Sequence, residues 1–126
     1  MQPVKMYEFP HAITGLRTDP KLTKDLRRVY KIICDFEYPE NQEIILTFNE
    51  VWAYRCTHYT AIDPVMVTIA YGEVVDLGST DWLRSTLAFL RAAHTEPQSL
   101  KHIATCFDDG PLYEFLCGSV EVTESS

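Results

Sequence analysis

The chain has 126 residues, and its 11 Lys or Arg against 18 Asp or Glu give a formal net charge of −7. This length predicts a single domain over residues 1–126, and a hydrophobic content of 46% excludes a disordered or fibrous chain. The acidic balance argues against a nucleic-acid-binding protein, because phosphate backbones are bound mainly by clustered cations and the chain has no run of Lys and Arg.

The first half of the chain predicts a hairpin. Residues 1–26 are expected to form an irregular segment over the core, because three prolines interrupt them. Apolar and polar side chains then alternate over residues 28–38, which predicts a half-buried strand. A polar turn at residues 39–42 precedes a second alternating run over residues 43–58. We expect this run to be one long bent strand, with a bulge or break at residues 49–50.

The middle of the chain predicts the main helix. Residues 61–72 are ambiguous, because an Asp-Pro pair signals a turn, and we expect an irregular segment followed by a strand. The next run, residues 73–77, indicates a short strand. Ser79 or Thr80 can then cap an amphipathic helix over residues 79–94, whose apolar side chains recur at steps of three and four.

The last part of the chain predicts a second hairpin. Residues 100–107 are apolar on both faces, which is typical of an interior strand. A dense turn signal at residues 108–111 leads to a strand over residues 112–122. The end of the chain, residues 121–126, is expected to be a polar tail.

Together these elements predict an α+β fold, with a mostly antiparallel sheet of five to six strands packed against one main helix at about residues 79–94. One helix of about four turns cannot cover the apolar side chains on both faces of such a sheet. We therefore expect the N-terminal segment or a partner chain to cover the remainder.

Several kinds of site are not expected. The four cysteines have no CxxC or CxxxC spacing, so we expect buried, reduced thiols at Cys34, Cys56, Cys106 and Cys117. The four histidines lack the spacing of metal ligands, and no catalytic, cofactor-binding or metal-binding residue is assigned. His102 is expected to be a core histidine hydrogen-bonded to a neighbour. Without a long apolar run or a secretory signal pattern, the chain is expected to be cytoplasmic, with no membrane partner.

Two polar clusters are candidate sites. The richest lies between residues 55 and 63, where a His near an Asp suggests acid–base work or a ligand pocket formed by Arg55, His58 and Asp63. No catalytic motif accompanies this cluster, and a strand end leading into a loop explains the same residues. The second cluster is the acidic turn and the strand after it. Here we expect a partner-binding edge made of Asp108, Asp109, Tyr113 and Glu114.

Residues 71–79, Trp82-Leu83 and the Phe-Asp-Asp-Gly-Pro-Leu-Tyr-Glu-Phe run at 107–115 resemble small bacterial proteins that look like the immunity proteins encoded beside polymorphic toxins. The resemblance covers about half the chain and carries no catalytic motif. It implies stoichiometric binding of a toxin domain, often a basic one, rather than turnover.

Three functions remain open from the sequence. The first is a non-enzymatic, acidic protein-binding module of the immunity type, whose partner is a basic protein. The second is a homo-oligomeric structural or regulatory subunit, in which a second copy covers the excess apolar surface. The third is a small-ligand-binding or enzymatic domain, with a pocket between sheet and helix near His58.

Overall fold

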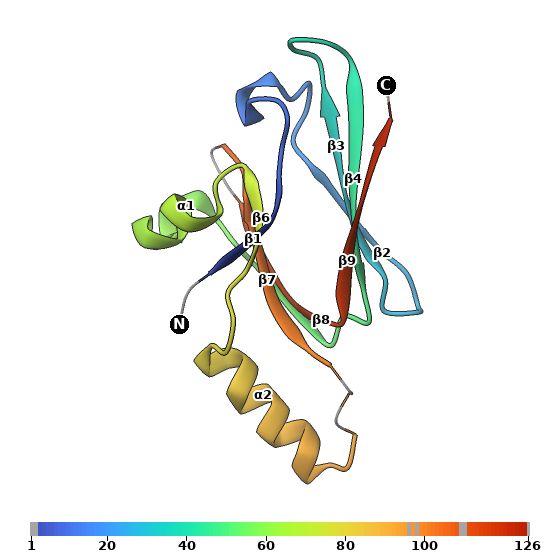
Figure 1. Cartoon of the computed structure of the whole chain (residues 1–126), viewed down its shortest axis with the longest axis vertical. Coiled ribbons are helices and arrows are strands. Elements are labelled where there is room, and N and C mark those ends of the chain that lie inside the picture. Colours follow the sequence, from blue (N-terminus) through green and yellow to red (C-terminus); the bar gives the residue numbers. More distant parts are fainter. Residues whose placement is uncertain (1–2, 96, 98, 109–110, 126) are drawn as a thin grey trace.

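The computed structural model describes residues 3–95, 97, 99–108 and 111–125. This part of the chain contains nine strands in two antiparallel sheets, together with two α-helices, so the expected α+β class is confirmed (Figure 1). The expected single sheet with one main helix is wrong. The second sheet supplies the apolar cover that one helix could not provide.

Each sheet combines strands that are distant in the sequence. Sheet A has the order β1-β6-β7-β8-β5, formed by Val4–Glu8, Glu73–Asp76, Lys101–Cys106, Leu112–Cys117 and Ala53–Thr57. Sheet B has the order β2-β3-β4-β9, formed by Lys21–Lys24, Tyr30–Phe36, Gln42–Asn49 and Ser119–Ser125. Both predicted hairpins are confirmed, since β3 pairs with β4 and β7 pairs with β8.

Both ends of the chain were predicted wrongly. The segment 1–26 contains strands β1 and β2 and a short 3-10 helix at Ile13–Gly15, and is therefore not irregular throughout. Residues 121–125 of the expected polar tail form the end of β9, which pairs with β4 along its whole length, and Ser126 lies outside the described residues. Both errors have the same cause, because edge strands carry polar side chains on their exposed face and bury only part of the other.

A bent two-stranded ribbon joins the two sheets. The expected long strand over residues 43–58 is two strands, β4 in sheet B and β5 in sheet A, and the chain changes direction at Glu50, where φ is 53°. The partner strand turns at Gly118, between β8 and β9. The Gly118 amide donates to the Asn49 carbonyl over 2.9 Å, and a Cβ at Gly118 would lie 3.0 Å from a Glu50 carboxylate oxygen. A side chain at Gly118 would therefore press against Glu50 and require the Glu50 side chain to shift.

The main core lies between the sheets. Its centre is the stacked pair Phe48 and Phe115, one from each sheet, with ring centroids 3.9 Å apart. Side chains of β8 alternate about this core, so that Tyr113 and Phe115 face sheet B while Leu112 faces the opposite side of sheet A. The expected interior position of residues 100–107 is confirmed, because five of the six β7 residues are buried.

Helix α1 (Pro64–Ala70) covers the outer face of sheet A, where it forms a second apolar cluster with β6, β7 and Leu112. A strand was expected here, and that prediction is wrong. Asp63 caps the helix by accepting a hydrogen bond from the Val65 amide over 2.9 Å, and Pro64 occupies the first helical position, where its missing N–H costs nothing.

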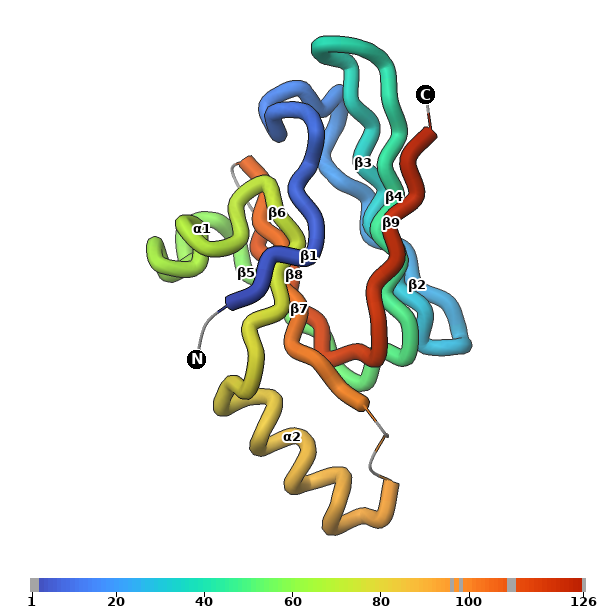
Figure 2. The backbone as a smooth tube through the Cα atoms, viewed as in Figure 1, coloured from blue at the N-terminus to red at the C-terminus, as the bar shows by residue number. Residues whose placement is uncertain are grey.

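Helix α2 (Asp81–Ala92) confirms the predicted main helix, with Thr80 as its N-cap. It extends away from the end of sheet A, and the backbone trace in Figure 2 shows its C-terminal half standing clear of both sheets. Phe89 on this half is accordingly 73% exposed. Within the described residues, neither helix has the length and apolarity needed to cross a membrane.

All four cysteines are free, and Cys34, Cys106 and Cys117 are buried as expected. The expectation is wrong for Cys56, which is exposed on the edge strand β5.

Replacing Phe115 by Ala removes the ring that joins the two sheets. We expect F115A to lower the free energy of unfolding by about 3–5 kcal/mol, measured by urea denaturation. The matched control is F89A, which deletes the same ring from an exposed helix position and is expected to change stability by less than about 0.5 kcal/mol. Equal losses in the two variants would contradict the packing described here.

Candidate functional site

A pocket of about 510 Å³ lies on the outer face of sheet A, between α1 and the first turn of α2. We call it the Glu114 pocket. It receives side chains from three strands, both helices and the 3-10 helix at Tyr59–Ala61. The lining residues are Arg55, Thr57, Ala61, Ile62, Asp63, Met66, Leu77, Thr80, Asp81, Trp82, His102, Leu112 and Glu114.

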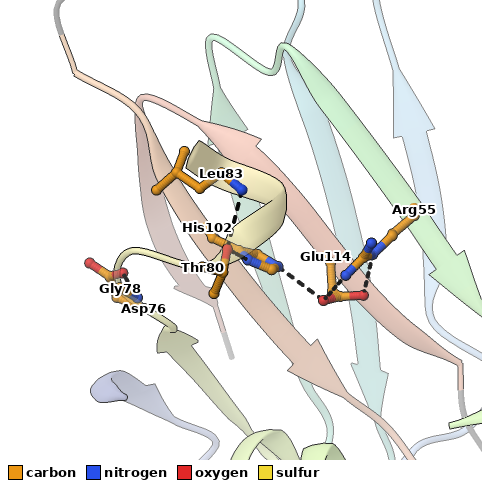
Figure 3. A network of polar contacts seen from close by, with 7 residues as sticks. All are labelled: Arg55, Asp76, Gly78, Thr80, Leu83, His102 and Glu114. Atoms are coloured by element: carbon orange, nitrogen blue, oxygen red, sulfur yellow. Dashed lines mark hydrogen bonds and ion pairs between the residues drawn. The ribbon is translucent and has the colours of Figure 1, made fainter. Parts of the chain in front are cut away.

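The base of the pocket is a buried carboxylate. Glu114 is 4% exposed, and the strand register places it directly opposite Arg55 on β5. The guanidinium grips both carboxylate oxygens, with Nε donating to Oε2 over 2.7 Å and Nη2 to Oε1 over 3.1 Å (Figure 3). Such two-point pairing fixes the orientation as well as the charge of both groups.

His102 links this ion pair to helix α2. It lies on β7, diagonally across from Glu114, and its Nε2 is 2.9 Å from Oε1 of Glu114. An ionised carboxylate only accepts hydrogen bonds, so Nε2 donates, and in the neutral ring Nδ1 then accepts from the Thr80 hydroxyl 2.6 Å away. Thr80 in turn accepts from the Leu83 amide over 3.3 Å. The network thus runs from the edge strand of sheet A to the start of α2 (Figure 3).

Trp82 is held between two members of this network. The Arg55 guanidinium carbon lies 4.1 Å from the centre of the indole ring, within the range of a cation–π contact. The His102 ring meets the indole edge to face, with centroids 5.1 Å apart. Arg55 is therefore fixed on one side by a carboxylate and on the other by an aromatic ring, although half of its side chain remains exposed.

The network determines the ionisation of Glu114. Burial alone would raise the pKa of this carboxyl, but hydrogen bonds from His102 and Arg55, together with the charge of Arg55, lower the pKa to about 2. Glu114 is consequently a carboxylate at neutral pH. Arg55 already offsets the charge of Glu114. Glu114 therefore holds the base of the pocket in place, and the other lining groups are the ones that face a ligand.

The walls of the pocket are apolar and part of its lining is acidic. Ile62, Met66, Leu77 and Leu112 supply the apolar surface. Asp63 and Asp81 contribute two further carboxylates at the starts of the two helices, where Asp63 caps α1 and Asp81 pairs with Arg84. Across the described residues, no group of three or more His, Cys, Asp or Glu side chains is placed to hold a metal ion. This chemistry suits an organic group that has an apolar stem and a positive charge.

The predicted ligand-pocket residues are partly brought together. Arg55 and Asp63 both line the Glu114 pocket, as expected for a shared site. His58 does not line it. The His58 ring contacts the Thr60 hydroxyl at 3.1 Å and borders a different hollow, together with Cys56 and Tyr113. No acid–base pair between His58 and Asp63 is formed.

The predicted partner-binding edge is also divided. Tyr113 and Glu114 are consecutive on β8, so they point to opposite faces of sheet A, and both are buried. Asp108 lies at the far end of the β7–β8 hairpin, where it accepts a hydrogen bond from the Tyr71 hydroxyl over 3.3 Å. Asp109 lies outside the described residues. Of the three described residues among these, only Glu114 lines the Glu114 pocket.

Sequence reasoning did not include Thr80, Trp82 or His102 in a site, although His102 is confirmed as a buried, hydrogen-bonded histidine. One signal in the sequence could have placed His102 beside Glu114. A hairpin closed at residues 108–111 puts residue 106 opposite 112 and residue 104 opposite 114, which makes His102 a diagonal neighbour of Glu114. No local signal could have shown that β5 pairs with β8.

Comparison with protein-family models gave no match for this chain, and searches of curated proteins and of solved structures gave none either. The resemblance of residues 71–79 and 107–115 to immunity proteins therefore stays a prediction.

The lowered pKa of Glu114 predicts a pH-dependent contribution to stability. A carboxyl whose pKa falls from 4.5 to about 2 on folding stabilises the protein above pH 4.5, and this contribution is lost as the pH falls toward 2. We expect E114Q to be less stable than the wild type by about 1–3 kcal/mol at pH 7, and the difference to shrink between pH 4.5 and pH 3.

Urea unfolding at a series of pH values measures this difference. The control is E40Q, which removes the same charge from an exposed turn and is expected to follow the wild-type profile. If the free energy of unfolding of E114Q and of the wild type changed with pH in parallel, the Glu114 carboxylate would not be the source of the pH dependence.

Proposed function

We propose that this chain is a non-enzymatic binding protein for a basic partner protein, and that the Glu114 pocket is the centre of the contact surface. The observation that carries the proposal is the combination of apolar walls with two exposed carboxylates, Asp63, which caps α1, and Asp81, which pairs with Arg84 at the surface of α2. A Lys or Arg side chain fits this chemistry, because its aliphatic stem packs on apolar surface while its charged head meets carboxylates.

The charge distribution supports a basic partner. All residues that line the pocket belong to residues 55–114, which contain 4 Lys or Arg against 8 Asp or Glu. A surface in such a negative field attracts cationic proteins and speeds their association.

Exposed aromatic side chains extend the surface beyond the pocket. Tyr59 and Tyr71 are about half exposed and, with Asp108, border a second depression on the other side of the α1 segment. Ile62 lines both depressions, so the two adjoin at this residue. Tyrosine is enriched at protein–protein interfaces because it offers a large apolar area with one polar group.

Neutralisation of a toxin domain, as the resemblance implies, is the specific form of this proposal. It requires stoichiometric binding without turnover, and the Glu114 network supports it by holding Arg55 and Trp82 in fixed positions before any partner arrives. A small-ligand-binding domain is the second candidate, because about 510 Å³ falls within the usual range of small-molecule pockets.

A matched pair of variants tests the proposal. D63N/D81N removes both pocket carboxylates but keeps side chains that can cap a helix, whereas E40Q/E43Q removes two charges from exposed residues at the β3–β4 turn. Each purified protein is used as bait in its source lysate at low and high salt. We expect the wild type and E40Q/E43Q to retain the same basic protein at equal stoichiometry, and D63N/D81N to retain at least tenfold less.

The outcome also separates the candidates. Retention that D63N/D81N leaves unchanged would contradict the assignment of the pocket, and an acidic retained protein would contradict the basic partner. A low-molecular-mass compound bound by the wild type but not by D63N/D81N, with no protein retained, would favour the small-ligand candidate.

A further inference from the structure

The cations of this acidic chain are concentrated on one hairpin. Residues 21–31, which contain β2 and the start of β3, hold five Lys or Arg against one Asp. The turn of this hairpin lies on the opposite side of the molecule from α1 (Figure 1), whose N-cap Asp63 and residue Met66 line the Glu114 pocket. The chain therefore carries a basic surface and an acidic surface that cannot meet within one molecule.

The turn between β2 and β3 is rigidly built. The Asp25 carboxylate accepts from the amides of Arg27 and Val29 over 2.8 and 3.2 Å, and the Asp25 amide donates to the Val29 carbonyl. Arg28 has a positive φ of 62°, and its guanidinium lies 4.1 Å from the centre of the Trp52 ring. The Arg28 carbonyl also accepts from the Val51 amide over 2.9 Å. These contacts fix the loop to the corner of the two sheets.

Leu26 occupies the tip of this turn and is fully exposed. A single exposed leucine is ordinary on a protein surface. Here, however, a rigid loop presents it, between the exposed cations Lys24 and Arg27. The tip therefore offers one apolar side chain near three cations and the Asp25 carboxylate, which is bonded to the turn amides, at little entropic cost for ordering.

The Glu114 pocket is the complement of this tip. Its apolar walls include Ile62, Met66 and Leu112, and its lining includes the carboxylates of Asp63 and Asp81. We propose that the β2–β3 turn of one copy docks into the Glu114 pocket of a second copy, with Leu26 against the apolar walls and Lys24 and Arg27 near the carboxylates. This inference rests on the proposed function, since it takes the basic turn of the chain itself as a ligand that the pocket accepts.

The contact is head to tail, because it joins two different surfaces. A pair keeps one free pocket on the copy that donates its turn and one free turn on the copy that accepts it, so further copies add until a ring closes or a filament forms. A foreign basic partner competes for the same pocket. Self-association and partner binding are therefore expected to exclude each other.

Two complementary variants test the inference. L26E/R27E alters only exposed side chains of the turn and leaves the Asp25 bonds and the Arg28–Trp52 contact in place. D63N/D81N alters only the pocket. In sedimentation velocity at increasing protein concentration and 150 mM salt, we expect the wild type and E40Q/E43Q to show a rising mass, and each of the two variants alone to stay monomeric. Circular dichroism confirms folding of each variant.

The mixture of the two variants is the decisive sample. L26E/R27E supplies an intact pocket and D63N/D81N an intact turn, so a 1:1 mixture is expected to form a heterodimer that grows no further. A wild type that remains monomeric, an L26E/R27E protein that still associates, or a mixture without heterodimer would overturn the inference.

The failure of this inference is distinguishable from failure of the proposed function. L26E/R27E keeps the pocket, so as bait it still retains the foreign basic protein if the proposed function holds, whatever the outcome for self-association. Loss of that retention in D63N/D81N alone confirms the pocket independently.

Discussion

The corner at Glu50 and Gly118 is the constraint on which both the core and the site depend. Two paired strands cross there from one sheet into the other, and the backbone hydrogen bond between Gly118 and Asn49 keeps them in register through the bend. Beyond the corner the same register sets Arg55 opposite Glu114. Before it, β4 carries Phe48, which stacks on Phe115 of β8 across the two sheets. A change in the corner would therefore move the core and the pocket together.

Glu114 shows how a buried charge can stabilise a binding surface. A carboxylate removed from water without partners would cost several kcal/mol, so the burial of Glu114 requires the ion pair with Arg55 and the hydrogen bond from His102. Glu114 in turn holds these two partners in place. Arg55 is kept over Trp82, and His102 is kept within reach of the Thr80 cap of α2. One ionised group thus positions the sheet edge, the indole and the start of a helix.

The elements that were predicted correctly from the sequence are those with local sequence signals. The N-cap at Thr80 and the two hairpins follow from capping, turn chemistry and a period of two, and the structure has all three. The missed strands β1 and β2 follow or precede prolines without containing them, so the prolines mark their limits rather than their absence. Asp63-Pro64 starts a helix as readily as a turn, and only the apolar face of sheet A decides between them. The site joins residues 55, 80, 102 and 114, and this grouping depends on strand pairing that no local pattern encodes.

The two tryptophans have a practical consequence. Each lies beneath an arginine: Trp52 beneath Arg28, behind the β2–β3 turn, and Trp82 beneath Arg55, at the Glu114 pocket. The sequence has no other tryptophan, so the intrinsic fluorescence of the protein has one reporter near its basic tip and one at its acidic pocket. Replacing either indole by Phe leaves an emission signal that comes from a single known place, and the protein can be observed at each of its two surfaces without an added dye.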